Sequence, residues 1–161
     1  MGLEPIPMET YAVFADRLFE ERGKHVSRRV VEQVYDMFDG CTWFVQMMMN
    51  ELFALTDHDG TCDVEKLDEA RQNVILLQES SYKDLLSRLA PKQKLLLQAI
   101  ARERLVRGIT SSAFIKKYNL SSASSVQAAL KPLLKNDIVM QNDDAYRVYD
   151  YFFSEWLANT Y

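Results

Sequence analysis

Apolar residues recur at helical spacing through most of the first half of the chain. Stripes of apolar side chains three and four residues apart predict four helices there. They cover residues 8–22, 27–39, 42–56 and 63–80. Gly23 and Gly40 mark the ends of the first two, because glycine commonly follows a helix C-terminus. The third helix is apolar on nearly all sides, Trp43 and the Met47–Met49 triplet included, which predicts a centrally buried helix.

The second half of the chain predicts shorter elements. Apolar stripes indicate helices, in chain order, over residues 82–89, 92–104 and 112–118. A tight turn follows, and a longer helix then begins at Ser121 or Ser122, because a serine hydroxyl commonly caps a helix N-terminus. Pro132 lies inside this helix and predicts a bend or an early end. Proline lacks the amide donor and disfavours helical geometry in the residue before it.

Two short β-like runs come next, at residues 138–141 and 146–149, and they predict a β-hairpin that turns at 142–144. A last helix is predicted over 151–159. Two helices, a tight turn, a third helix and a hairpin stand in the order of a winged helix-turn-helix.

The composition changes near Ser80 and Ser81, which we take as the boundary between two domains. We therefore predict a mainly α fold: a helical bundle in residues 1–80, followed by a winged helix-turn-helix with one small β-hairpin in residues 81–161.

Charge is divided unevenly between the two halves. The net charge of the 161 residues is −4. Residues 1–81 hold 7 Lys and Arg against 16 Asp and Glu, a net charge of −9, whereas residues 82–161 hold 12 against 7, a net charge of +5. Such asymmetry suggests modules with different partners, although a chance bias between two solvated surfaces would give the same pattern.

The chain contains no recognisable catalytic or cofactor motif. None of its five glycines belongs to a phosphate loop, and His25 and His58 have no partner at metal-binding spacing. The run DHDG at 57–60 begins like a calcium loop, but its glycine comes too early and Asp68 replaces the glutamate needed at the twelfth position. We expect no enzyme activity, no ATP binding, no cofactor and no metal in this chain by itself.

Other features point to the cytoplasm. No apolar run is long enough to span a membrane, and the first residues do not form a signal peptide. Cys41 and Cys62 make no CxxC pair and no disulfide framework. We expect a cytoplasmic chain with no membrane partner.

The basic second half favours a contact with double-stranded DNA. Polar residues at the start of the predicted third helix of the winged domain could reach phosphates or base edges, and cations around it could supply backbone contacts. The candidate DNA-binding residues are Lys116, Lys117, Ser122, Ser124, Ser125, Gln127, Lys131, Lys135 and Arg147. The helix carries no arginine, so bidentate reading of guanine by arginine is not available from it, and non-specific contact is favoured.

Two observations keep other functions open. Serines at that position cap and turn the chain whatever the helix does, and Asp143 with Asp144 at the hairpin tip would repel DNA. The acidic first half and the aromatic residues near the C-terminus also fit a protein-interaction module. A free-standing winged-helix transcription factor is a third reading.

Several segments resemble the C-terminal part of the archaeal-type ATPases, which belong to the P-loop AAA+/STAND class. The most specific are DGCTWFVQ at 39–46 and YNLSSASSVQAALKPLL at 118–134, with further likeness in LEPIPMETYAVFADRLFEERGKHV at 3–26 and YRVYDYFFSEWL at 146–157. The resemblance covers nearly the whole chain.

The resemblance implies a layout in which a P-loop ATPase core is followed by a helical lid and a winged helix. Residues 1–80 would be the lid and residues 81–161 the winged helix, and the chain's first partner would be its own N-terminal ATPase core. ATP and Mg²⁺ would belong to that core. Related lids carry a nucleotide-sensing arginine at the start of the third lid helix, where this chain reads Gly40-Cys41-Thr42-Trp43, so that role is not carried over.

Overall fold

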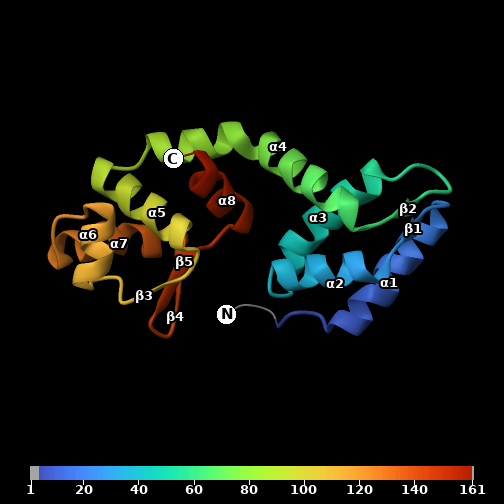
Figure 1. The fold of residues 1–161 in the computed structure, drawn as a ribbon, viewed down its shortest axis with the longest axis horizontal. Coiled ribbons are helices and arrows are strands. Elements are labelled where there is room, and N and C mark those ends of the chain that lie inside the picture. The colour runs from blue at the N-terminus through green and yellow to red at the C-terminus, as the bar shows by residue number, and fades with distance from the viewer. Residues whose placement is uncertain (1–3, 161) are drawn as a thin grey trace. The chain divides into compact units, whose positions relative to one another are not determined.

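The computed structural model describes residues 4–160 and is built mainly from α-helices (Figure 1), which confirms the predicted mainly α fold. The chain forms two compact units, Met1–Leu77 and Gln78–Tyr161. Helix α4, Leu67–Ser87, contributes its first part to one unit and its last part to the other. Within the described residues, no helix is long and apolar enough to cross a membrane.

The first unit contains three helices besides the start of α4. They are α1 (Met8–Glu21), α2 (Arg28–Met37) and α3 (Thr42–Leu55). Two-residue strands β1 (His25–Val26) and β2 (Thr61–Cys62) pair in parallel, and a single 3₁₀ turn, η1 (Val64–Lys66), leads into α4. The helices agree with the predicted ones, whereas the parallel pair was not predicted.

The core of the first unit lies between one face each of α1, α2 and α3. Val30 and Val34 of α2 and Met48 and Leu52 of α3 are fully buried, as hydrophobic spacing requires. Trp43 is 70% exposed, so the prediction that it is a core residue is wrong. The buried side of α3 is formed by residues that share one face, and Trp43 in the first turn points away from that face.

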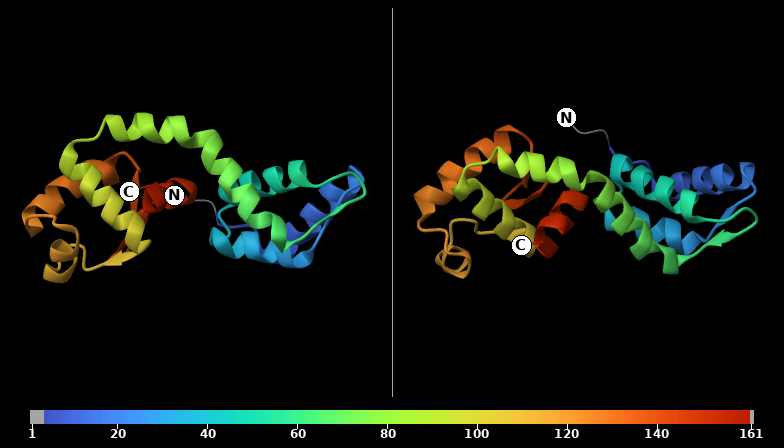
Figure 2. Two further views of the ribbon diagram at one scale, coloured as in Figure 1. Left: turned by 45° about the horizontal axis from the view of Figure 1, so that its top comes forward. Right: turned by 90° about the horizontal axis from the view of Figure 1, so that it is seen from above.

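Helix α4 runs without interruption from Leu67 to Ser87 (Figures 1 and 2), so the predicted break between helices 63–80 and 82–89 is wrong. Ser80 and Ser81 both keep the backbone N–H that a helix needs, so neither interrupts its hydrogen bonds. Ion pairs between residues one turn apart, Lys83 with Glu79 and Arg88 with Asp84, also stabilise this part of the helix. The composition changes where α4 passes from one unit to the other, but the backbone does not break there. The domain limits at 80 and 81 stay a prediction.

The second unit follows the predicted order. Its helices are α5 (Pro91–Glu103), α6 (Ser112–Tyr118), α7 (Ala123–Lys135) and α8 (Tyr151–Thr160). The hairpin lies where the sequence predicted it, with β4 at Val139–Asn142 and β5 at Ala145–Val148. A further strand, β3 (Val106–Arg107), was not predicted; it pairs antiparallel with β5 and completes a sheet of order β3-β5-β4.

Helix α5 is the central element of the second unit. Its buried residues are Leu96, Leu97, Ala99, Ile100 and Ala101. They cover more than one side of the helix, and α5 accordingly contacts α6, α7, α8 and β5. Helix α7 packs on α5 through its buried residues, and the rest of the α7 surface faces solvent.

Aromatic packing joins the end of α4 to α8. The rings of Tyr82 and Phe153 stack with their centroids 4.9 Å apart, and the Trp156 indole Nε1 donates a hydrogen bond to Glu79 Oε1 at 3.3 Å. Asp150 caps α8 by accepting from the backbone amides of Phe152 and Phe153. Because its carboxyl is largely buried, desolvation raises the pKa of Asp150.

Helix α7 continues through Pro132 to Lys135, so it does not end early at the proline, and the alternative that the sequence predicted, a bend, stays a prediction. Leu133, directly after it, is fully buried, and this packing holds the chain in helical geometry. The Pro132 carbonyl is also used, because it accepts from the Asn136 backbone amide and from Asn136 Nδ2, each at 3.0 Å. Tertiary packing therefore outweighs the local preference of the proline.

Replacing Pro132 by alanine should be neutral or stabilising. Alanine restores the amide donor that proline lacks and favours helix, while the unfolded chain gains conformational freedom that offsets part of the gain. We expect the free energy of unfolding, measured by urea titration, to rise by about 1 kcal/mol. A loss of stability would show that the proline ring contributes more by packing than its missing hydrogen bond costs.

Candidate nucleic-acid interface

The start of α7 is organised by Ser122. The Ser122 Oγ accepts a hydrogen bond from the Ser125 backbone amide at 3.1 Å, and it lies 3.2 Å from the Ser124 Oγ. This is the usual geometry of a helix N-cap, in which a side-chain oxygen satisfies an amide of the first turn. Ser122 thus has a structural role that does not depend on DNA.

One exposed stripe runs along α7. Its members are Ser124, Gln127, Lys131 and Lys135, which follow one another at spacings of three and four residues and are exposed. We call these four residues the α7 stripe. The opposite side of the helix is formed by Val126, Ala129, Leu130 and Leu133, all buried. Four of the nine candidate residues therefore share one solvent-facing surface.

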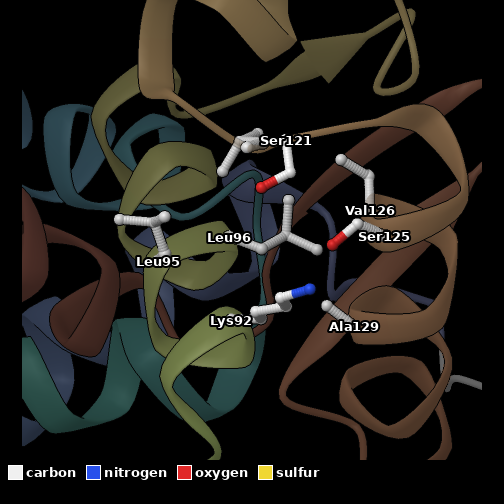
Figure 3. A pocket seen from close by; sticks show the side chains of 8 residues that line it. Lys92, Leu95, Leu96, Ser121, Ser125, Val126 and Ala129 are labelled. Atoms are coloured by element: carbon white, nitrogen blue, oxygen red, sulfur yellow. The ribbon is translucent and has the colours of Figure 1, made fainter.

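Ser125 lies away from this stripe. It is half-buried and lines a small pocket between α5 and α7, together with Lys92, Leu96 and Val126 (Figure 3). The Lys92 side chain, from the first turn of α5, lies across the pocket from the Ser125 hydroxyl. The sequence did not single out Lys92, because more than thirty residues separate it from Ser125 and no local pattern relates the two.

The two neighbouring lysines of α6 differ in their surroundings. Lys117 Nζ lies 2.5 Å from Glu103 Oε1, and the Tyr118 hydroxyl donates to the same oxygen. The hydrogen bond from Lys117, and after it that from Tyr118, lowers the pKa of the Glu103 carboxyl. The hydrogen bond between Lys117 and Glu103 also raises the pKa of the Lys117 ammonium. Lys116 is exposed and makes no ion pair within residues 4–160.

Arg147 is held by the protein itself. Its Nη1 donates to the carbonyl oxygens of Val148 and Tyr149, each at 3.0 Å, and its guanidinium lies 4.3 Å from the centre of the Tyr151 ring. These contacts fix the chain where β5 leads into α8. A guanidinium engaged in this way must give up contacts to bind a phosphate.

The hairpin tip is acidic. Asp143 and Asp144 are both exposed, and Arg107 of β3 pairs with Asp144 through a contact of 2.8 Å. One carboxylate is thus neutralised and the other is not. The tip is therefore unfavourable for a phosphate backbone, as the sequence suggested, although less so than two free carboxylates would be.

The comparisons with known proteins agree with this geometry. Residues 80–159 match a family described as "Probable winged helix domain". The second unit is a winged-helix domain.

A solved structure of a Walker-type ATPase from Pyrococcus abyssi has the same fold over 95% of this chain, with a TM-score of 0.68 and 20% sequence identity. The chain spans 42% of the length of that protein. No curated protein matches the sequence. The likeness extends over both units and shows their fold, and the predicted winged-helix region is confirmed.

The two serines at the start of α7 should contribute differently to the stability of the domain. Replacing Ser122 by alanine removes the cap and should lower the free energy of unfolding by about 1 kcal/mol. Replacing Ser124, whose backbone position is already helical, should change it by less than about 0.5 kcal/mol. Urea unfolding of the two variants gives the comparison, and equal losses would contradict the assigned cap.

Proposed function

We propose that this chain is the region that follows the core of a P-loop ATPase, with residues 1–80 as its helical lid and residues 81–161 as its winged helix. The fold shared with a Walker-type ATPase supports this proposal, since that protein is more than twice as long as the aligned region. The segments of the sequence that resemble archaeal-type ATPases support it independently. ATP and Mg²⁺ would bind in the core, because this chain has no phosphate loop.

Within that protein, the winged helix would contact the phosphate backbone of double-stranded DNA through the α7 stripe. The observation that carries this proposal is the position of Lys131 and Lys135. Both are exposed on a helix whose opposite side is packed into the domain, and neither pairs with a carboxylate anywhere in the part of the chain that the structure describes. Lys116 on α6 is a third cation of the same kind.

The same stripe favours contact without reading of sequence. Of its two uncharged side chains, Gln127 is able to make a bidentate contact with a base edge, which suits adenine, while Ser124 is short and adaptable. Lysines that contact phosphates give affinity that is independent of sequence and falls with salt. The acidic hairpin tip offers no further base contact.

A second function is favoured by the surface of the first unit. Val13 of α1 and Trp43 of α3 are 67% and 70% exposed, and Phe14 and Leu18 of α1 are also exposed. Three of these side chains lie on one helix, α1, and a group of exposed large apolar side chains favours a protein contact more than single scattered ones do. We propose that the first unit docks on protein, its own ATPase core being the partner that the resemblance implies, while the second unit contacts DNA.

The salt dependence of duplex binding tests the DNA contact. With about three lysines on phosphates, the slope of log affinity against log salt should be near −3, and Lys131→Gln with Lys135→Gln should reduce its magnitude by about 2. The matched control is Lys66→Gln with Lys83→Gln, which removes the same charge elsewhere and should leave the slope unchanged. Fluorescence anisotropy over a salt series measures all three proteins.

Two duplexes of equal length and unrelated sequence complete the test. They should bind within about 10-fold of each other, because phosphate contacts carry no sequence information. Absence of binding to both at about 50 mM salt would leave only the protein-docking function. A difference of more than about 100-fold would mean that α7 reads bases.

A further inference from the structure

The small pocket between α5 and α7 brings together polar groups from three parts of the chain. Its apolar floor is formed by buried side chains of α5, α7 and the turn before α7: Leu96, Leu120, Val126 and Ala129. Three polar side chains surround this floor, those of Lys92 in α5, Ser121 in the turn and Ser125 in α7. Among the described residues, no Asp or Glu lines the pocket.

The three polar side chains are directed inward. Figure 3 shows the hydroxyl oxygens of Ser121 and Ser125 pointing into the pocket, with the Lys92 nitrogen across from Ser125. The backbone of Ser121 has a φ of +72°, a left-handed conformation that residues other than glycine seldom adopt. A hydrogen bond of 3.0 Å from the Ser122 amide to the Leu120 carbonyl closes the turn around it. Backbone strain of this kind is found preferentially at binding sites.

The protein itself does not use these groups. The backbone amide of Ser125 donates to Ser122, but within residues 4–160 the hydroxyls of Ser121 and Ser125 make no hydrogen bond. Lys92 is exposed and forms no ion pair in the same part of the chain. It differs in this respect from Lys117, which is paired with Glu103. One ammonium and two hydroxyls are therefore available as hydrogen-bond donors to a ligand.

This donor set suits one oxygen of a phosphate group. Lysine and serine are among the side chains that commonly contact the phosphates of DNA. The pocket offers about 20 Å³ of space to water-sized groups, which is room for a single such group. It therefore fits an oxygen that a larger molecule presents and excludes a whole nucleotide.

The pocket adjoins the proposed DNA-contacting surface. Ser125 directly follows Ser124 of the α7 stripe, and with Ala129 it lies on the flank of α7 between the stripe and α5. An α-helix is about 10–12 Å across and the major groove of DNA about 12 Å wide. A helix that meets a duplex consequently has phosphates beside its flanks as well as in front of its exposed stripe.

We propose that the pocket between α5 and α7 receives a phosphate oxygen of the DNA backbone, held by the Lys92 ammonium and by the hydroxyls of Ser121 and Ser125. The inference rests on the duplex contact proposed for α7 and adds α5 to it. Lys92 supplies charge, so its contribution falls with salt and is independent of base sequence. The two serines orient the phosphate without neutralising it.

The salt dependence of duplex binding tests the role of Lys92. Adding Lys92 to the three lysines counted above should steepen the wild-type slope of log affinity against log salt from about −3 to about −4. Lys92→Gln should reduce its magnitude by about 1. The matched control is Lys94→Gln, since Lys94 lies on nearly the opposite side of α5 and does not line the pocket. This control should leave the slope unchanged. Fluorescence anisotropy with the whole chain measures each protein.

The serines should give a different signature. Ser121→Ala combined with Ser125→Ala should weaken duplex binding about 3- to 10-fold, because two hydrogen bonds to the phosphate are lost. The salt slope should not change, since hydroxyls release no counterions from the duplex. In the Lys92→Gln background the same two changes should cost less, because groups that hold one phosphate are coupled. Urea unfolding of each variant shows whether the domain keeps its stability.

The outcomes separate this inference from the α7 contact. Equal slopes for Lys92→Gln and Lys94→Gln would overturn the pocket, and the α7 contact would stand if Lys131→Gln with Lys135→Gln still lowers the slope. A slope lowered by Lys92→Gln alone would support the pocket and contradict the α7 stripe. Absence of duplex binding by the wild type at about 50 mM salt would overturn both.

A last comparison distinguishes DNA from free phosphate. Replacing chloride by inorganic phosphate at constant ionic strength should affect duplex binding by the wild type and by Lys92→Gln equally. A loss of affinity confined to the wild type would mean that free phosphate fills the pocket, and would overturn the assignment to DNA.

Discussion

The winged-helix domain depends on the packing of α5. Leu97 and Ile100 are completely buried, and α5 is in contact with three helices and with the central strand of the sheet. Full burial of one such side chain contributes roughly 1.5–3 kcal/mol. Because α7 is held against α5 by its own apolar side, the orientation of α7 is fixed from within the domain. The α7 stripe is therefore the side of the helix that stays exposed when the apolar side packs into the core.

The basic residues of the domain differ in whether they are engaged within the protein. Lys117, Arg107 and Arg147 bind groups of the protein itself, namely Glu103, Asp144 and backbone carbonyls. These contacts secure α6 to α5, β3 to the hairpin tip and β5 to α8. Lys131 and Lys135 have no such role. The net charge of the half-chain thus overstates the surface available to a nucleic acid, and the position of each cation matters more than their number.

Hydrophobic spacing was sufficient to predict the hairpin, the winged helix-turn-helix order and the helices other than α4, which was predicted as two, because these elements follow from local periodicity. It failed where the outcome is decided by distant contacts. Two residues are too few to show the alternation of a strand, so β3 was not predicted although β5 pairs with it. Trp43 is apolar but exposed, and Pro132 is helical because Leu133 packs beyond it. The cap at Ser122 could be predicted because its partner, the Ser125 amide, is three residues away, whereas the surroundings of Ser125 and Lys117 depend on neighbours that only the fold supplies.

The central claim is that the α7 stripe is the surface that meets duplex DNA. A photoreactive benzophenone side chain placed at Ala128, an exposed residue beside Ser124 and Lys131, tests it directly, with the same group at exposed Ser81 on α4 as the control. Illumination at about 50 mM salt should cross-link duplexes of any sequence from position 128, far more than from position 81, and added salt should suppress the product. Equal yields from the two positions, or none from position 128, would contradict the account.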